Sequence, residues 1–280
     1  SEPKIIKAEK AYLELSYVQR DAVTNYPALT AARISINKIL SDAVIEKIAA
    51  IGTVTLDSGS KIVAAESGYN SLTAEQKSSV SNYDVLTDAR AIFDVMAAIQ
   101  AIDKITVNSQ DAIDTAKNLY SALTSAQRLK VTNYADLADA EAVFPVVSLI
   151  ASLGAVTAED LEKIENAESD YAALSSVQKA KVGNYPDLTA ARAAYPVVLL
   201  IDDIGTVTVN SGEKITLARN AYGELSASQK RALGNYGLLV DSEAAYEVVI
   251  KISEIDSAIS LGSIQSIMDA ETAYSALSAA

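Results

Sequence analysis

The sequence predicts an all-α protein, built as a tandem array of three-helix-bundle repeats of about 51 residues that forms an elongated rod. The main observation is a Tyr-x-x-Leu step that returns after 57, 51, 51, 51 and 52 residues, beginning at Tyr12, Tyr69, Tyr120, Tyr171, Tyr222 and Tyr274. Apolar residues around each step recur at intervals of three and four, the period that lines one face of a helix. Because no Gly- or Ser-rich spacer separates the repeats in the sequence, neighbours are expected to pack directly together.

Composition excludes several classes of function before any motif is considered. The 280 residues include no cysteine and no histidine, which removes disulfides, thiolate metal sites, cysteine nucleophiles and the usual general base. A net charge of -13 opposes contact with phosphate backbones or anionic lipid. No apolar run reaches the roughly 18 residues that a membrane-spanning helix needs. We therefore predict no catalytic site, no metal, no cofactor, no nucleic-acid partner and no membrane span.

Each Tyr-x-x-Leu step is followed by a predicted capping box, in which a Ser or Thr caps a helix and a Gln three residues later bonds back to it. The five boxes are Ser16 with Gln19, Thr73 with Gln76, Thr124 with Gln127, Ser175 with Gln178 and Ser226 with Gln229. A basic residue follows each Gln, at Arg20, Lys77, Arg128, Lys179 and Lys230. One reading makes these residues a ligand-binding row. The reading that we favour is a helix cap followed by a solvated charge, because the spacing already satisfies the free N–H groups of a helix start.

An Asn-Tyr pair closes each box and marks a predicted break in the helix, since Asn tolerates turn geometry. Its tyrosines, Tyr26, Tyr83, Tyr134, Tyr185 and Tyr236, are the candidate ligand contacts, because a ring beside a helix break can be partly exposed and aromatic rings stack on sugars. The tyrosines of the Tyr-x-x-Leu steps are instead predicted to be core residues. Replacing Tyr120 with Ala is accordingly expected to cost about 3 kcal/mol, the value for a buried aromatic side chain.

A third helix type begins at Ser41, Asp94, Pro145, Pro196 and Glu247 in this interpretation, because Pro is tolerated only in the first turn of a helix and acidic residues suit that end. Gly52 is predicted to end the first of these helices in a left-handed conformation. A short connector follows each of these helices, as at residues 52–55, 154–157 and 205–208. After the connectors, Ser58, Ser109, Asp160 and Ser211 are predicted to cap the next helix.

These boundaries divide the chain into four complete repeats and two partial ones. The complete repeats are residues 41–93, 94–144, 145–195 and 196–246. Residues 1–40 form a partial repeat with the second and third helices, and residues 247–280 form one with the first and second helices. The partial repeats suggest a piece of a longer array. A head-to-tail association of copies is the alternative that we keep open.

Residues 51–89 contain the string Tyr-x-x-Leu-Thr-x-x-Gln-Lys-x-x-Val-x-Asn-Tyr-x-x-Leu, between Tyr69 and Leu86. This string resembles the tandem helical repeats of large secreted or cell-wall-attached multidomain proteins of Gram-positive bacteria. The resemblance covers nearly the whole chain. It implies an extracellular or cell-surface location and a stalk-like role, and it provides no catalytic residues.

The function expected from the sequence is therefore a non-enzymatic structural spacer that displays or separates other domains of a larger polypeptide. Two alternatives remain. One is an adhesin-type module that binds a cell-wall or host glycan or a host protein, and the other is a self-assembling surface-layer or fibre subunit. The exposed positions vary between repeats without focus on one of them, and this pattern favours the spacer.

Overall fold

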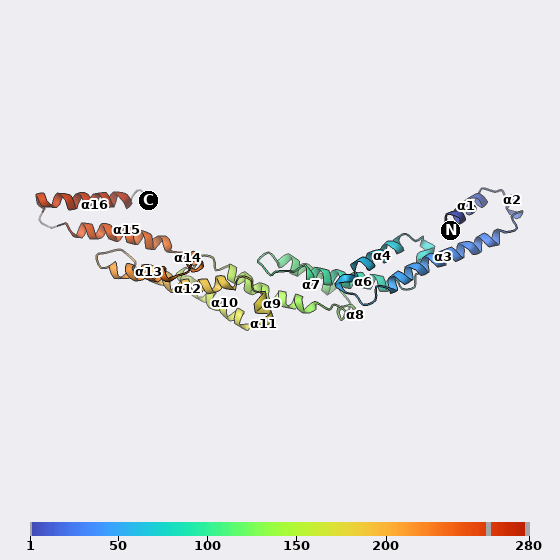
Figure 1. The fold of residues 1–280 in the computed structure, drawn as a ribbon, viewed down its shortest axis with the longest axis horizontal. Helices are drawn as coiled ribbons and strands as arrows, with labels where there is room; N and C mark the ends of the chain where they lie inside the picture. The colour runs from blue at the N-terminus through green and yellow to red at the C-terminus, as the bar shows by residue number, and fades with distance from the viewer. Residues whose placement is uncertain (1, 256–258, 278–280) are drawn as a thin grey trace. The chain divides into compact units, whose positions relative to one another are not determined.

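The computed structural model describes residues 2–255 and 259–277. These residues form sixteen α-helices and three short 3-10 helices, with no strand among them, so the predicted all-α class is confirmed (Figure 1). The parts of the predicted partial repeats that comprise residues 1, 256–258 and 278–280 lie outside the described residues.

Helices of three lengths return in a fixed order. The long helices are α3 (Tyr26–Ala49), α6 (Tyr83–Gln100), α9 (Tyr134–Ala151), α12 (Tyr185–Asp202) and α15 (Tyr236–Ser253). The medium helices are α1 (Glu2–Leu13), α4 (Gly59–Asn70), α7 (Gln110–Ala122), α10 (Leu161–Ala173), α13 (Gly212–Glu224) and α16 (Ile264–Leu277). The short helices are α2 (Tyr17–Asp21), α5 (Ala74–Ser78), α8 (Ser125–Arg128), α11 (Ser176–Lys181) and α14 (Ala227–Ala232). The 3-10 helices η1 (Leu56–Ser58), η2 (Ala158–Asp160) and η3 (Leu261–Ser263) lead into α4, α10 and α16.

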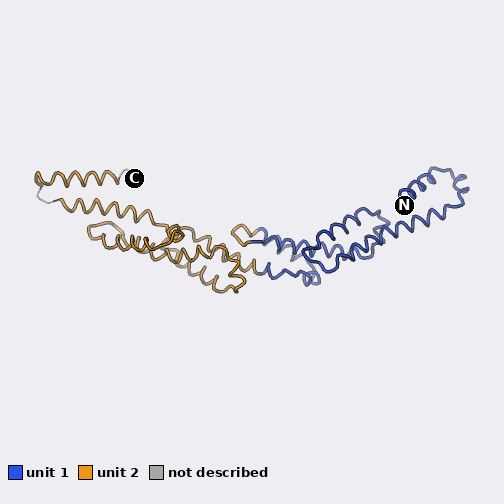
Figure 2. The backbone as a smooth tube through the Cα atoms, viewed as in Figure 1, with its two compact units in different colours: residues 1–103, 111–138 blue, residues 104–110, 139–280 orange. Residues whose placement is uncertain are grey.

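The chain divides into two compact units (Figure 2). Unit 1 consists of residues 1–103 and 111–138, and in it α3 packs against α1, α4, α5 and α6. Unit 2 consists of residues 104–110 and 139–280, and in it α12 packs against α10, α13, α14 and α15, while α16 packs against α15. In both units a long helix is therefore shared between the medium helix before it and the medium and short helices after it.

The core of each unit is aliphatic. Fully buried side chains include Ile48, Ile62, Ile92 and Met96 in unit 1 and Ile164, Leu188, Ile201 and Leu239 in unit 2. Ala65, Ala116, Ala167 and Ala218, at the same place on four medium helices, have no exposed surface at all. A small side chain at this place lets each medium helix approach its neighbours closely, and the branched residues fill the space on either side.

The long helices run without interruption through the predicted repeat boundaries, which fall inside α6, α9, α12 and α15. The prediction that helices begin at Ser41, Asp94, Pro145, Pro196 and Glu247 is wrong, because these residues lie inside α3, α6, α9, α12 and α15. An interior proline removes one helical hydrogen bond and costs about 3 kcal/mol in an isolated helix. The residues that follow each proline, Val146 with Val147 and Val197 with Val198, are buried, and this packing holds the helix together across the proline.

The connectors behave largely as expected. Gly52 has φ +63°, and Gly154 and Gly205 have φ values of +53° and +60°, so the predicted left-handed helix end is confirmed. Val54, Ile105 and Val156 are buried. In unit 2 the connector also pairs with the segment before an Asn-Tyr pair, since Val156 N donates to Ala232 O at 2.7 Å and Gly234 N donates to Val156 O at 2.9 Å.

The predicted role of Ser58, Ser109, Asp160 and Ser211 needs a correction. The side chains of Ser58, Asp160 and Ser211 make no capping bond to the helix that follows them. They accept instead from the backbone N–H three residues earlier, at 2.9 Å from Thr55 to Ser58, 2.8 Å from Thr157 to Asp160 and 2.9 Å from Thr208 to Ser211. Ser109 accepts in the same way from Thr106 at 2.9 Å. They therefore close a turn before the helix rather than its first turn.

Candidate functional site

The five capping boxes are present as predicted. In each, the Ser or Thr side chain accepts from the backbone N–H of the Gln, and the Gln side chain accepts from the backbone N–H of the cap. At Thr73 the two distances are 3.3 and 2.9 Å. The boxes thus start the short helices and fix the turn from each medium helix into the short one.

Four of the five basic residues that follow the boxes, all except Lys77, bind the end of the preceding medium helix. Arg128 donates through Nε to Tyr120 O at 3.2 Å and through Nη2 to Ser121 O at 2.5 Å. Lys179 donates to Ala172 O at 2.8 Å, and Lys230 donates to Gly223 O at 3.2 Å. A cation at a helix C-terminus satisfies free carbonyl groups and interacts favourably with the helix dipole. This geometry agrees with the cap-and-charge reading of the row.

The two tyrosines that flank each box stack on one another, fourteen residues apart. The stacked pairs are Tyr12 with Tyr26, Tyr69 with Tyr83, Tyr120 with Tyr134, Tyr171 with Tyr185 and Tyr222 with Tyr236, with ring centroids 3.9, 4.0, 4.3, 4.0 and 4.5 Å apart. The same basic residue lies over the first ring of each pair, at 4.9 to 5.6 Å from its centroid. We call each of these groups, a cation with two stacked rings, a tyrosine corner.

The candidate ligand contacts are partly exposed, as expected for rings at a helix break. The exposed fractions are 39% for Tyr26, 41% for Tyr83, 40% for Tyr134, 37% for Tyr185 and 37% for Tyr236. The expectation that their partners are core residues is wrong, because Tyr12, Tyr69, Tyr120, Tyr171 and Tyr222 are only half-buried, and Tyr274 is 65% exposed. The aliphatic side chains fill the interior so fully that the rings lie at its edge.

The Asn of the Asn-Tyr pair makes a contact that sequence reasoning missed. The side-chain amides of Asn82, Asn133, Asn184 and Asn235 donate to the backbone carbonyl groups of Ile45, Met96, Val147 and Val198, at 3.1, 3.0, 2.8 and 2.9 Å. The acceptor always lies 37 residues earlier, inside the preceding long helix. No local pattern in the sequence predicts this contact, because its donor and acceptor lie many helical turns apart. We call this contact the Asn lock.

A second bond of constant spacing accompanies the Asn lock in three of the repeats. The Gln of the capping box donates to a side chain 39 residues earlier, from Gln76 to Asn37 at 2.9 Å, from Gln127 to Asp88 at 2.6 Å and from Gln178 to Asp139 at 3.0 Å. For Gln229 the corresponding position is Ala190, which offers no side-chain acceptor. The box Gln thus caps a short helix and holds it against a long one.

Ion pairs join medium helices to long helices at a separation of 24 residues. They are Glu9 with Arg33, Glu66 with Arg90, Glu168 with Arg192 and Arg219 with Glu243, and in each the guanidinium binds both carboxylate oxygens. The bidentate hydrogen bonds from Arg90 and Arg192 hold the pKa values of Glu66 and Glu168 below the ordinary value. These carboxylates are therefore charged at neutral pH.

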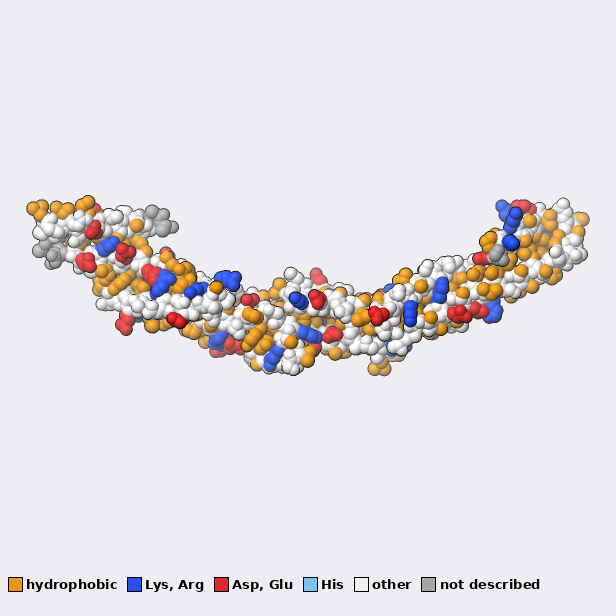
Figure 3. Space-filling model, viewed as in Figure 1, with side chains coloured by type: hydrophobic (Ala, Val, Ile, Leu, Met, Phe, Trp, Pro, Cys, Tyr) orange, Lys and Arg blue, Asp and Glu red, His pale blue; other side chains and the backbone are white. Residues whose placement is uncertain are grey.

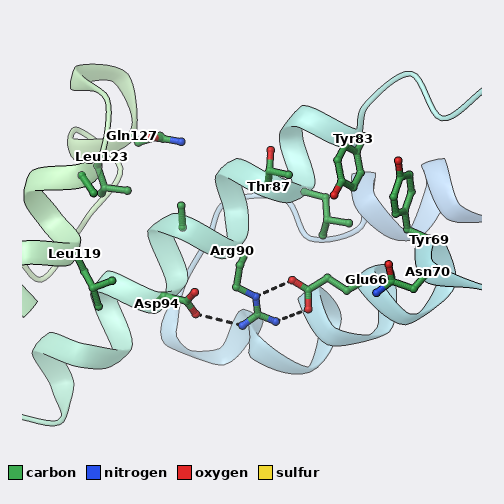
Figure 4. A pocket seen from close by; sticks show the side chains of 13 residues that line it. Glu66, Tyr69, Asn70, Tyr83, Thr87, Arg90, Asp94, Leu119, Leu123 and Gln127 are labelled. Carbon is green, nitrogen blue, oxygen red and sulfur yellow. Dashed lines mark hydrogen bonds and ion pairs between the residues drawn. The ribbon is translucent and has the colours of Figure 1, made fainter. Parts of the chain in front are cut away.

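A groove of about 610 Å³ lies beside one tyrosine corner of unit 1 (Figure 4). Tyr69 and Tyr83 line one end, Leu119 and Leu123 line the other, and the Arg90 ion pairs lie between them. Arg90 donates to Glu66 at 2.7 and 2.6 Å and to Asp94 at 3.3 Å. Two other repeats have Pro145 and Pro196 at the positions that correspond to Asp94. The Asp94 carboxylate in this groove therefore has no equivalent in those repeats.

The described residues contain no group of three or more acidic side chains arranged to hold a metal ion. None of the helices within these residues has the length and apolar character needed to cross a membrane. On the face drawn in Figure 3, acidic and basic side chains are interspersed along the chain. No protein-family model, no curated protein and no solved structure matches the chain.

Proposed function

We propose that this chain is a non-enzymatic spacer, a tandem array of three-helix repeats that forms an elongated rod and separates or displays other domains of an extracellular bacterial surface protein. The observation that carries the proposal is the sharing of long helices between repeats. The Asn lock ties the start of one long helix to the preceding one, as in Asn184 to Val147 and Asn235 to Val198. A chain in which successive helices overlap in this way has no flexible joint at the repeat boundary.

The use of the recurring side chains supports the same proposal. The box Gln, the basic residue after it, the Asn and the 24-residue ion pair all bind other parts of this chain, and they do so in several repeats alike. Repetition of internal contacts is what a spacer requires, because each repeat must fold and join its neighbours in the same way. The extracellular location and the flanking domains rest on the sequence resemblance alone.

The spacer proposal is tested by changing the number of repeats. Deleting residues 145–195, or duplicating them, should shorten or lengthen the maximum dimension in small-angle scattering by an equal step of about 20 Å, because α12 begins beside Val147, about 20 Å of helical rise after the start of α9. A matched control inserts a Gly- and Ser-rich segment of the same length, whose contribution grows only as the square root of residue number. Unequal steps, or a maximum dimension that does not change, would reject the rod.

A binding role for a glycan is the second candidate, and the groove beside Tyr83 and Arg90 is the observation that favours it. Its volume lies in the range of small-molecule sites, and it combines an exposed ring with hydrogen-bonding side chains. Screening the chain against immobilised glycans tests this role. A hit that disappears in Tyr83→Leu and persists in the equivalent variant Tyr185→Leu would favour an adhesin. Binding that both variants retain would exclude this groove.

Association of copies head to tail is a further proposal for a surface-layer or fibre subunit. Light scattering at increasing concentration distinguishes it from the spacer. A mass that stays that of one chain would count against it.

A further inference from the structure

The ion pairs between medium and long helices change direction from one repeat to the next. In unit 2, the acid Glu168 lies on α10 and its partner Arg192 on α12, with Nε–Oε1 and Nη2–Oε2 distances of 2.7 and 2.5 Å. In the next repeat the base Arg219 lies on α13 and the acid Glu243 on α15, again as a bidentate pair. Both pairs span 24 residues, so they occupy the same place in the two repeats.

The buried aliphatic side chains at these places do not distinguish the two repeats from each other. Ile164 and Ala167 on α10 correspond to Ile215 and Ala218 on α13, and all four are buried. Leu188 on α12 likewise corresponds to Leu239 on α15. If α10 took the place of α13 on α15, or α13 took the place of α10 on α12, the same kinds of aliphatic side chain would be buried. Burial is non-directional, and pairing between the wrong repeats is a characteristic failure of repeat proteins.

The charges do distinguish the correct pairings from the wrong ones. With α10 in the place of α13 on α15, Glu168 would face Glu243, and with α13 in the place of α10 on α12, Arg219 would face Arg192. The side chains of the correct pairs are between 32% and 40% exposed, so solvent screens them only in part. Two like charges held at this place repel each other, and a bidentate bond is lost as well.

We propose that the alternating direction of these ion pairs is a pairing code, which directs the charged face of each medium helix to the long helix that follows it and keeps it out of the corresponding place on a neighbouring long helix. In the sequence the alternation extends further, because Lys117 and Glu141 occupy the corresponding positions with the base first. From residue 66 onward the order is thus acid-base, base-acid, acid-base, base-acid.

In unit 1 two neighbouring ion pairs do not alternate in direction. Its pairs Glu9–Arg33 and Glu66–Arg90 have the same direction. These two neighbours are 57 residues apart rather than 51, and the long helix α3 between them has 24 residues, where α6 has 18. Six more residues lengthen a helix by about 9 Å and turn its face by roughly 240°. Here the charges do not distinguish the correct helix pairing from the wrong one, but the different length of α3 does.

The test is the double variant Arg219→Glu with Glu243→Arg in the full chain. It keeps an ion pair at this place but gives it the direction of the Glu168–Arg192 pair. The urea midpoint of unfolding should therefore stay unchanged, while the fraction of molecules that refold with wrong pairing should rise about five-fold. The control Arg219→Lys with Glu243→Asp keeps the direction and should refold like the unmodified chain.

Repeated stretching and relaxation of single molecules detects the wrong pairing. A wrong pair of α10 with α15 joins positions 168 and 243 and so encloses 51 more residues than a correct pair, which releases about 180 Å more contour length when it is pulled apart. Handles attach through cysteines added at the two ends, since the chain contains none of its own.

A rise of the long events in the reversed variant alone supports the code. An equal rise in the control, or no rise in either variant, overturns it. A second measurement needs no variant. At 1 M salt the screening length falls to about 3 Å, so the unmodified chain should form the long events several times more often than at 0.1 M. No change with salt would also overturn the code.

Discussion

The side-chain amide of Asn184 donates to the backbone carbonyl of Val147 at 2.8 Å, and so ties the start of α12 to the interior of α9. The same bond recurs at Asn82, Asn133 and Asn235, always across 37 residues. A residue that the sequence assigned only to a local turn thus joins two successive long helices.

Asn184→Ala should lower the free energy of unfolding by about 1 kcal/mol, the net value of a hydrogen bond of this kind. Among the described residues Asn184 Oδ1 is buried and has no hydrogen-bond partner, so the substitution also removes an unpaired acceptor, which limits the loss. Asn184→Asp should cost more, because a carboxylate would face the Val147 carbonyl. Urea unfolding measures both, with Asn210→Ala, at an exposed residue, as the control. Equal values for Asn184→Ala and the control would contradict the lock.

The stacked pair Tyr171–Tyr185 should show a coupling energy of about 1 kcal/mol in a double-mutant cycle of Tyr171→Leu and Tyr185→Leu. Because both rings are partly exposed, each single substitution should cost less than the 3 kcal/mol expected for a buried ring. Tyr171 and Tyr236 belong to different pairs, so their cycle should be additive. Coupling as large in that second cycle would mean that stacking is not the cause.

Thr73→Ala should destabilise the chain by about 1 kcal/mol, because the backbone N–H of Gln76 loses its acceptor at the start of α5. Thermal unfolding of this variant is compared with that of Thr132→Ala, at an exposed residue outside the boxes. If the two melting temperatures agree within error, the box contributes nothing to stability.

Asp160 gives unit 2 a pH dependence in the acid range. The hydrogen bonds from the Lys163 ammonium and from Thr157 lower its pKa to about 2, from an ordinary value of 3.8. A lowered pKa in the folded state stabilises the fold above the unfolded pKa, and this contribution is lost as pH falls from about 4 towards 2.

The matched variant is Asp160→Ser, since Ser58, Ser109 and Ser211 accept the same bond in the other repeats. At pH 7 the unmodified chain should be more stable than Asp160→Ser by about 1 to 2 kcal/mol. The difference should shrink to near zero at pH 2. A difference that does not vary between pH 7 and pH 2 would show that the carboxylate charge contributes no stability.

The sequence by itself determined the features that depend on residues within one helical turn. The capping boxes, the left-handed Gly52 and the apolar face of Ile62 and Ala65 follow from spacings of three or four residues, where local geometry leaves one favourable outcome. The period of 51 residues also revealed that these features recur.

Only the tertiary structure decided the contacts between distant positions. It stacked Tyr83 on Tyr69, aimed Asn184 at Val147, and carried α12 through Pro196, where the local cost of proline predicted a break. These outcomes span 14 to 37 residues or depend on burial from two sides. In these cases the free energy of tertiary packing outweighs the local conformational preference. The sequence pattern of a single helix does not contain that contribution.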